Sequence, residues 1–370
     1  LVLWLGTTKV TDDNKNNILN NADAPTATFN PDGNILTLNG MNLTTTSVTK
    51  SGILSCLSSL TIVVNGNNTI TCDDSCTAIR ADLEGAQTLT LVKGSDDCML
   101  TLNTLRAIRD FSSITLTGLA WDNNYTYSNN MLMKNGTTEV GNCALSEGID
   151  LWVEGIQVTS ANAANVLGGS PARVTFDAET NTLTLNGAYI VTSNSAGIKS
   201  GLANLNVVLS GGQSEVKCTG EDYYAFEGTS ENATVSFSSS ATSEGNLYIT
   251  TAGYKKFFTD ITPAYEGLAH FDQTSTNYDE YFYLIRKSPW TGSGTADDPY
   301  LVSTTTELKT ISTYVNQGIV LNYSFKLNND IDWSQETSAF TSIGERKGNY
   351  TIFSFDGTFD GNNKTISNLT

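Results

Sequence analysis

The chain contains 370 residues, of which 38 are Asp or Glu and 20 are Lys or Arg, so its formal net charge at pH 7 is −18. This charge disfavours binding to nucleic acid or to an anionic membrane surface, and no run of Lys or Arg offers a phosphate-binding stripe. No apolar run reaches the ~18 residues that a transmembrane helix needs, so we expect no membrane span in this chain.

The chain begins with LVLWLG (1–6), which has the pattern of a strand rather than of a signal peptide. We therefore expect an export signal to have been removed or to lie outside this numbering. Trp4 in this strand and Trp152 in the matching strand LWV (151–153) both have apolar neighbours, and we expect both to be core residues.

This opening block returns later in the chain. LWLGTTKVT (3–11) matches LWVEGIQVT (151–159), and NILTLNG (34–40) matches NTLTLNG (181–187). Two more pairs of blocks follow in the same order, and the offset between the copies stays between 145 and 149 residues. A conserved order of this length indicates a duplicated domain. The two further pairs are SGILSCLSSLTIVV (51–64) with AGIKSGLANLNVVL (196–209), and GLAW (118–121) with GLAH (267–270).

A shorter repeat runs inside each copy, in which a small residue precedes a large apolar one every 26 to 29 residues. Strand patterns such as LTIVV (60–64) and LNVVL (205–209) follow these pairs. A repeat of this length built from short strands is typical of a β-solenoid, whose repeats span ~20–45 residues. Stacked coils bury their inward side chains and pair their backbones into parallel sheets. The small–large pairs are Gly52-Ile53, Ala78-Ile79, Ala107-Ile108, Gly197-Ile198, Ala225-Phe226 and Gly253-Tyr254.

Each solenoid also needs a closed end, because an open end offers unpaired strand edges to other chains. Residues 2–20 and 150–168 have the pattern of such an end piece, with one strand, a short helical turn and then the first coil. We predict an all-β fold of short right-handed parallel β-helix (solenoid) modules in tandem. A pair of β-sandwiches is the alternative, because strand periodicity alone does not separate the two.

The sequence changes in character after residue 288. A Gly/Ser/Asp linker leads into a predicted helix, where Thr304 and Glu307 have the spacing of a capping box and Leu308, Ile311 and Tyr314/Val315 form an apolar stripe. Strands are expected at residues 324–332 and 352–370, and the chain stops within this pattern. We predict β-helix module A at 1–147, its duplicate module B at 148–288, and at 289–370 the start of a third β-helix-like region with one capping helix, which we expect to continue in the natural protein.

Two parts of the chain resemble known sequences. GSGTADDPYLVSTTTELKTIS (292–312), FKLNNDIDW (325–333) and FDGTFDGNNKTISNLT (355–370) resemble the entry segment of right-handed β-helix domains in bacterial surface proteins, some with GLUG-type repeats. DLWVEGIQVTSANAANVLG (150–168) with TLTLNGAYI (182–190) resembles a repeated β-helix module of exported proteins from gut bacteria. The resemblance implies a secreted or cell-surface protein of the carbohydrate-binding or adhesin-like kind, and it carries no catalytic motif.

The cysteines offer three alternatives. The close pair Cys72 and Cys76, with Cys98, is the candidate for a disulfide, and buried thiols are the other reading. A zinc site would need four Cys or His ligands, and the only histidine, His270, is distant in sequence.

Catalytic residues are sparse. The acidic pairs Asp73/Asp74, Asp96/Asp97, Glu221/Asp222 and Asp297/Asp298 are sequence neighbours in predicted turns, and a glycosidase needs two carboxylates that flank one bond. DDNKNNILNNAD (12–23) is similar to a calcium loop but has Asn17 where an EF-hand loop needs Gly, so we interpret it as a capping turn. We expect no cofactor. Calcium bound at an Asp/Asn corner is the one alternative, and the sequence does not indicate which residues would bind it.

Aromatic residues in polar surroundings supply the candidate ligand site, because sugar rings stack on Trp and Tyr. For Trp121 the alternative role is to cover the end of the solenoid. The candidate ligand-binding residues are Trp121, Tyr125, Tyr127, Tyr223, Tyr224 and Trp290.

We expect a non-enzymatic extracellular protein that binds a polysaccharide or another host or cell-surface ligand. The alternatives are a polysaccharide lyase or glycoside hydrolase on a β-helix scaffold, and a structural spacer or stalk.

Overall fold

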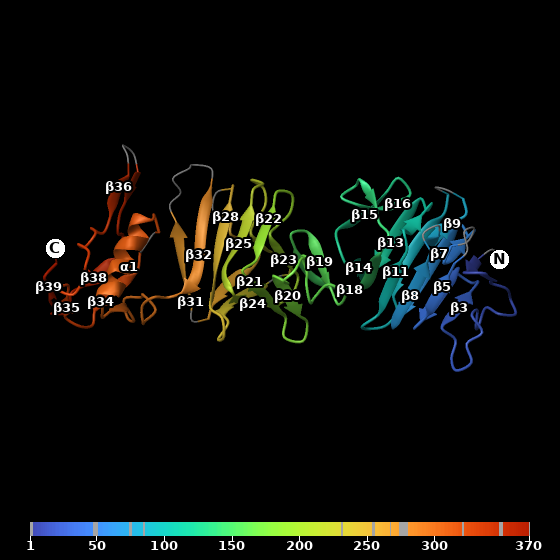
Figure 1. The fold of residues 1–370 in the computed structure, drawn as a ribbon, viewed down its shortest axis with the longest axis horizontal. Coiled ribbons are helices and arrows are strands. Elements are labelled where there is room, and N and C mark those ends of the chain that lie inside the picture. The colour runs from blue at the N-terminus through green and yellow to red at the C-terminus, as the bar shows by residue number, and fades with distance from the viewer. Residues whose placement is uncertain are drawn as a thin grey trace. The chain divides into compact units, whose positions relative to one another are not determined.

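The computed structural model describes residues 3–46, 51–73, 76–83, 86–230, 232–253, 256–266, 268–273, 280–319, 322–347 and 351–369. The chain divides into two compact units, Leu1–Gly168 and Gly169–Thr370 (Figure 1). Short strands build both units, and α1 (Thr305–Asn316) is the single helix among the described residues.

The first unit contains the strands β1 (Leu3–Leu5), β2 (Thr8–Lys9), β3 (Ala27–Asn30), β4 (Ile35–Asn39), β5 (Asn42–Thr45), β6 (Ile53–Ser55), β7 (Ser59–Asn65), β8 (Asn67–Cys72), β9 (Thr77–Ala81), β10 (Thr88–Lys93), β11 (Met99–Asn103), β12 (Arg106–Arg109), β13 (Ser113–Thr117), β14 (Leu119–Trp121), β15 (Tyr125–Ser128), β16 (Met131–Lys134), β17 (Thr138–Glu139), β18 (Cys143–Val153) and β19 (Ile156–Thr159).

The second unit contains β20 (Val174–Asp177), β21 (Thr182–Asn186), β22 (Tyr189–Thr192), β23 (Ile198–Ser200), β24 (Asn204–Ser210), β25 (Gly212–Cys218), β26 (Phe226–Gly228), β27 (Thr234–Ser239), β28 (Gly245–Thr251), β29 (Phe258–Thr259), β30 (Thr262–Tyr265), β31 (Leu268–Gln273), β32 (Tyr281–Lys287), β33 (Tyr300–Val302), β34 (Ser324–Leu327), β35 (Ile331–Asp332), β36 (Glu345–Lys347), β37 (Thr351–Phe353), β38 (Thr358–Asp360) and β39 (Ile366–Ser367).

The strands of the first unit wind into a three-sided coil, and each coil contributes one strand to every side. From β4 to β10, each strand pairs in parallel with the strand three places later, as Ile35 with Thr61 and Ser59 with Thr88 show. This confirms the predicted β-solenoid and excludes the β-sandwich alternative, in which antiparallel sheets face each other. Side I consists of β4, β7, β10 and β13, side II of β5, β8 and β11, and side III of β6, β9 and β12.

Alternation of apolar and polar residues explains why these segments form inward-facing strands. In β7, Leu60, Ile62 and Val64 are buried, whereas the residues between them point outward. Ile62 lies opposite Leu36 of the previous coil and Leu91 of the next, so inward side chains form continuous ladders. Full burial of each such side chain contributes ~1.5–3 kcal/mol.

Small residues occupy a tight position on side III. A Cβ atom added at Gly52 would lie 2.4 Å from Cγ2 of Ile70 and 2.6 Å from the carbonyl oxygen of Ala78. Ala78 and Ala107 hold the same place in the next coils and are fully buried. The predicted small–large pattern therefore marks a place where neighbouring coils approach closely.

Asn68 connects three coils at another corner. Its buried Oδ1 accepts a hydrogen bond from the Met41 N–H at 2.7 Å, and its Nδ2 donates to the carbonyls of Asn65 and Gly66 at 3.0 Å. In the second unit Ser214 has this position, and its Oγ accepts from the Ala188 N–H at 3.0 Å. Both side chains satisfy a backbone donor that the coil geometry leaves inside.

Antiparallel strands bound side III of the first unit. β1 pairs with β6 at one edge, and β16 pairs with β12 at the other. After the β1–β2 hairpin, one helical turn follows, in which Thr11 and Asn14 exchange side-chain to backbone hydrogen bonds. The described part of the predicted end piece at residues 2–20 therefore has the expected strand and helical turn, and residues 12–23 form a capping turn as interpreted.

The prediction that Trp4 and Trp152 are core residues is wrong. Leu3 and Leu5 are buried, and Trp4 between them points to the other face, where the Lys9 ammonium lies 6.0 Å from its ring centre. Trp152 lies in the same way between two buried residues of β18 and pairs with Gln157, as Trp4 pairs with Lys9. Strand alternation sends the two tryptophans outward.

The second unit repeats this architecture. Side I consists of β21, β24, β27 and β30, side II of β22, β25 and β28, and side III of β23, β26 and β29. The antiparallel pair β31–β32 then closes side II, because β32 pairs with β28. Tyr254, part of the predicted pattern here, lies outside the described residues.

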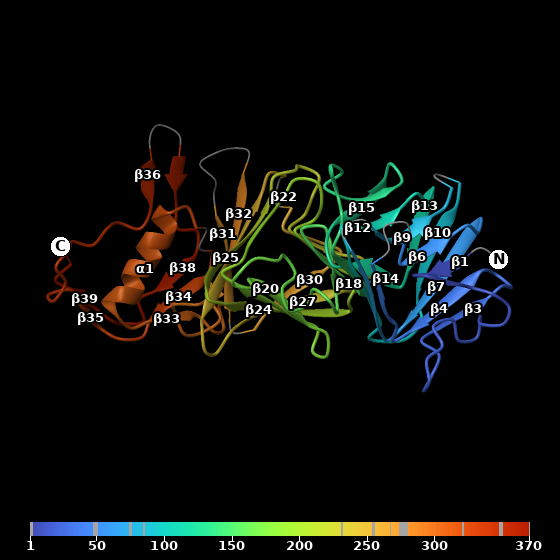
Figure 2. The same ribbon diagram turned by 45° about the vertical axis from the view of Figure 1, so that its right-hand side comes forward.

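A third strand set follows in the same unit. β33, β34 and β38 pair in parallel, as do β35 and β39, with α1 between β33 and β34 (Figure 2). The predicted capping box of Thr304 and Glu307 is present, and the predicted apolar stripe of α1 is buried. This stripe packs in one core with Phe271 of β31 and Leu284 of β32.

Candidate functional site: an aromatic pocket around the single histidine

A pocket of about 590 Å³ lies in the second unit, where β31 and β32 meet the segment that leads to β33. Aromatic and hydroxyl side chains dominate its lining. It is lined by Tyr265, Leu268, Ala269, His270, Lys287, Ser288, Pro289, Trp290, Thr291, Gly292, Ser293, Tyr300 and Tyr323.

Strand pairing stacks one wall of this pocket. Tyr265 ends β30 and lies opposite Phe237 of the previous coil, so their rings stack at 5.9 Å. On its other side the Tyr265 ring stacks on His270 at 4.3 Å, and His270 stacks on Tyr283 at 5.6 Å. The hydroxyl oxygens of Tyr265 and Tyr283 are 2.6 Å apart, which holds the stack in register.

The floor of the pocket is buried. Trp290 is 4% exposed, and its Nε1 donates to the carbonyl of Glu307 in α1 at 3.1 Å. Burial also raises the pKa of Tyr300, whose ring lies 5.5 Å from that of Trp290. The Tyr323 hydroxyl donates to the carbonyl of His270. The floor is therefore preorganised by contacts with the helix and with β31.

The rim is polar and exposed. Lys287 forms an ion pair with Glu244 at 2.6 Å, and both side chains are 63% exposed. Thr291 and Ser293 are exposed hydroxyl residues at the mouth. The arrangement combines ring surfaces with hydrogen-bonding groups, which is the composition of small-molecule sites.

A second hollow of about 340 Å³ adjoins the pocket, because Leu268 and Lys287 line both. Its remaining lining is polar apart from one alanine. It is lined by Ser238, Ser239, Ser240, Ala241, Glu244, Glu266, Leu268 and Lys287.

Of the six predicted ligand residues, Trp290 is the one that lines this pocket. Its neighbours in the lining were not among the predicted residues, although the sequence holds one signal for them: GLAH matches GLAW, so His270 corresponds to Trp121. The strand pairings agree, since Trp121 lies opposite Leu145 in β18 and His270 opposite Ile285 in β32.

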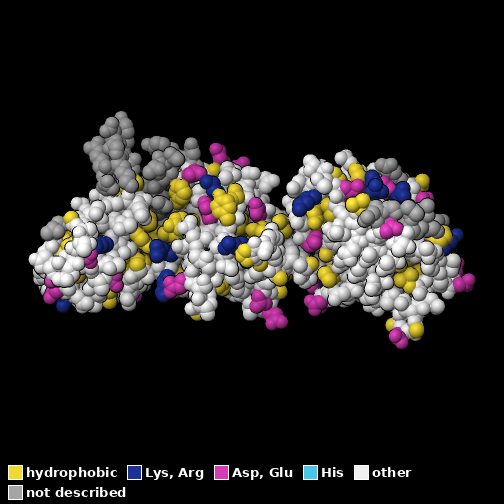
Figure 3. Space-filling view, viewed as in Figure 1, with side chains coloured by type: hydrophobic (Ala, Val, Ile, Leu, Met, Phe, Trp, Pro, Cys, Tyr) yellow, Lys and Arg dark blue, Asp and Glu magenta, His cyan; other side chains and the backbone are white. Residues whose placement is uncertain are grey.

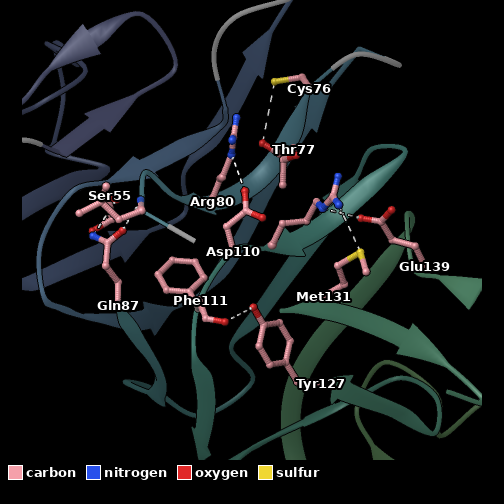
Figure 4. A network of polar contacts seen from close by, with 12 residues as sticks. Ser55, Cys76, Thr77, Arg80, Gln87, Asp110, Phe111, Tyr127, Met131 and Glu139 are labelled. Atoms are coloured by element: carbon pink, nitrogen blue, oxygen red, sulfur yellow. Dashed lines mark hydrogen bonds and ion pairs between the residues drawn. The ribbon is translucent and has the colours of Figure 1, made fainter. Parts of the chain in front are cut away.

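Trp121, Tyr125 and Tyr127 come together in the first unit. The rings of Trp121 and Tyr125 meet edge to face at 6.3 Å, and all three residues are half-buried against the core. Burial raises the pKa of Tyr125 to about 12. The Tyr127 hydroxyl donates to the carbonyl of Phe111 at 2.9 Å (Figure 4). These contacts fit a residue group that covers the end of the coil.

Tyr223 and Tyr224 lie at a coil corner in the second unit, outside the pocket lining. Both are half-buried, and the Lys256 ammonium lies 5.5 Å from the centre of the Tyr224 ring.

All six cysteines are thiols in the structure. The sulfur atoms of Cys72 and Cys76 lie 3.7 and 3.9 Å from the carbonyl oxygen of Thr77, the second contact being drawn in Figure 4. Burial raises the pKa of Cys72 to about 12, so at neutral pH it is a thiol and a poor nucleophile. A disulfide among Cys72, Cys76 and Cys98 stays a prediction.

Asp96/Asp97 and Glu221/Asp222 lie in turns, as predicted, and Asp297/Asp298 lie in a bend. Asp73 directly follows β8, and Asp74 lies outside the described residues. The side chains of Asp96 and Asp222 are 91% and 97% exposed. In the part of the chain that the structure describes, no group of three or more His, Cys, Asp or Glu side chains could hold a metal ion.

The described residues also contain no helix long and apolar enough to cross a membrane. On the face in Figure 3, acidic and basic side chains are interspersed among uncharged polar ones.

The chain matches no known protein-family model and no solved structure. Among curated proteins it is similar to halomucin of Haloquadratum walsbyi, with 38% identity over 80 residues. These residues are 22% of this chain and 1% of halomucin, so the match is partial on both sides.

Proposed function

We propose that the protein is a non-catalytic extracellular or cell-surface protein that binds glycan in the aromatic pocket around His270. The observation that carries the proposal is the pocket itself, about 590 Å³ with five aromatic side chains in its lining. This volume lies within the ~300–1,000 Å³ of typical ligand sites. The resemblance to β-helix modules of exported bacterial proteins supports the same class of function.

The chemistry of the lining suits a sugar. The half-buried rings of Tyr265, His270 and Tyr323 offer apolar surface for the C–H face of a pyranose, and hydroxyl groups at the mouth can bind its hydroxyls. Trp290 and Tyr300 support the site from below. We assign a weaker, second site to Trp121 with Tyr125 and Tyr127, because Trp121 corresponds to His270. Tyr223 and Tyr224 would at most extend binding along the coil.

Binding is favoured over hydrolysis by the state of the nearby carboxylates. A glycosidase needs a general acid that sits in an apolar environment. Glu244 is instead 63% exposed and paired with Lys287. A spacer without a ligand site is the remaining alternative.

The test is binding to a panel of immobilised host, plant and microbial glycans, with and without calcium, for the wild type, Tyr265→Leu and Tyr189→Leu. Tyr189 is a matched control, since it is a tyrosine of the same unit that is 64% exposed and does not line the pocket. We expect Tyr265→Leu to weaken binding at least tenfold, which is the ~1.4 kcal/mol of a lost ring contact, and Tyr189→Leu to bind like the wild type.

A panel without any hit would favour the spacer. A hit that Tyr265→Leu leaves unchanged would contradict the placement at His270, and Trp121→Ala would then test the first unit.

A further inference from the structure

Resting on the glycan site proposed above, we infer that the occupant is a neutral oligosaccharide chain that continues from the aromatic pocket into the second hollow. The two hollows share Leu268 and Lys287, which face each other across the β31–β32 pair. An oligosaccharide bound in the pocket can therefore pass over the β31–β32 strand pair and stay in contact with the protein surface.

The continuity follows from how solenoid corners stack. The serines of the second hollow follow or end β27, and Glu266 follows β30, the next strand on side I. Neighbouring strands lie ~4.8 Å apart, so side chains at successive corners form a row along the coil axis. The aromatic pocket and the second hollow together form a groove along this row of side chains. A linear oligosaccharide has the shape that fits such a groove.

At the matching corner of the first unit, a lysine side chain crosses the surface. Lys93 binds Asp96 at 2.7 Å and Glu147 at 2.5 Å, and it lies over Gly118, where an added Cβ would be 3.0 Å from that of Lys93.

The strand register identifies the residue of the second unit that takes the place of Lys93. Lys93 lies opposite Val64, and Ser239 lies opposite Leu209, the last residues of two matching blocks. By the same registers Glu266 replaces Thr117, and Lys287 replaces Glu147. The second copy thus has a short hydroxyl side chain where the first has a bridging lysine.

The charged side chains around the two hollows favour an uncharged oligosaccharide. Lys287 is neutralised by Glu244, and Glu266 adds a further carboxylate to the second hollow. A uronate or sulfated sugar would meet this carboxylate and the net charge of −18. Neutral sugars instead donate hydroxyl hydrogens to Glu266, and charge-assisted hydrogen bonds of this kind are strong.

The experiment is isothermal titration with malto-, cello-, xylo- and manno-oligosaccharides of one to six sugar units, and with oligogalacturonate as the anionic probe. For one neutral series we expect the tetrasaccharide to bind about tenfold tighter than the monosaccharide, as one or two additional hydrogen bonds predict. Oligogalacturonate should not bind better with length.

Two variants transplant the first copy's corner into the second. Ser239→Lys should abolish the length dependence while leaving monosaccharide binding, because Ser239 lines the second hollow and not the aromatic pocket. Glu266→Thr should reduce the length dependence. Tyr265→Leu should weaken binding at every length. If Ser239→Lys fails to fold by circular dichroism, Glu266→Thr decides alone.

Monosaccharide binding without length dependence in the wild type would overturn this inference and leave the proposed function standing. So would full length dependence in both corner variants. Failure of every neutral series would overturn both.

Discussion

Replacement of Asn68 by alanine tests how much one buried polar side chain holds the coils together. The change removes the acceptor of the Met41 N–H and two bonds to the carbonyls of Asn65 and Gly66. The Asn65 carbonyl keeps a second donor, the Gly40 N–H at 3.2 Å. The main cost is therefore one buried amide without an acceptor, together with the loss of the side-chain bonds.

A buried donor without an acceptor costs ~1–3 kcal/mol, and each lost hydrogen bond adds ~0.5–1.5 kcal/mol. We expect Asn68→Ala to lower the free energy of unfolding by about 3 kcal/mol. With a urea slope of about 2 kcal/mol per molar, the midpoint falls by about 1.5 M. Asn68→Ser should cost only about 1 kcal/mol, because Ser214 shows that a hydroxyl can accept from the same backbone position.

The assay is urea denaturation of the full chain followed by circular dichroism, with hydrogen exchange of the peptide around Met41 as a local readout. Asn68→Ala should lose protection there, and Asn68→Ser should retain most of it. Equal destabilisation by the two variants, or a loss below about 0.5 kcal/mol for alanine, would refute the reasoning, because surface substitutions already reach that size.

Three further predictions use the same denaturation assay. Gly52→Ala should lower the free energy of unfolding by ~1–3 kcal/mol through its clash with the Ala78 carbonyl, and Gly361→Ala, which meets nothing within 4 Å, should change it by less than ~0.5 kcal/mol; equal effects would contradict the packing argument. Burial raises the pKa of Cys72 to about 12 and of Cys218 to about 11, against 9.0 unperturbed. Above pH 9 the unfolded chain therefore releases protons that the folded chain keeps, so stability should fall between pH 9 and 11, more steeply in the wild type than in Cys218→Ala. A flat profile would show that these thiols are solvated. Thr304→Ala should remove ~1 kcal/mol by breaking the capping box of α1, and an unchanged midpoint would mean that packing alone holds the helix.

The coil architecture could be predicted because it depends on sequence patterns that repeat over short distances along the chain. The small–large pairs recur once per coil, and the strand after each of them alternates inward and outward residues, as β7 does. The capping box at Thr304 is equally local. The same alternation predicts an outward side chain for Trp4, because Leu3 and Leu5 on either side of it point inward.

The pocket could not be predicted in this way. Its wall requires Tyr265, His270 and Tyr283 to stack, and this depends on the register of three strands rather than on any motif. Its floor also needs Tyr300, which follows the linker, and Tyr323, which follows α1. The match of GLAH with GLAW pointed to His270. The role of a single histidine in a duplicated block cannot be inferred, however, until the side chains around it are known.

The antiparallel strands at the edges of side III constrain how such a protein can evolve. β1 and β16 use the backbone groups that a further parallel coil would need for pairing. A single inserted coil at either edge would find no partner strand, so this solenoid cannot lengthen by small steps there. Copying the whole bounded block leaves every edge covered, and the recurrence of the sequence at an offset of 145 to 149 residues is consistent with such a copy. Once two complete copies existed, one could keep its bridging Lys93 while the other acquired Ser239 and the hollow that it lines.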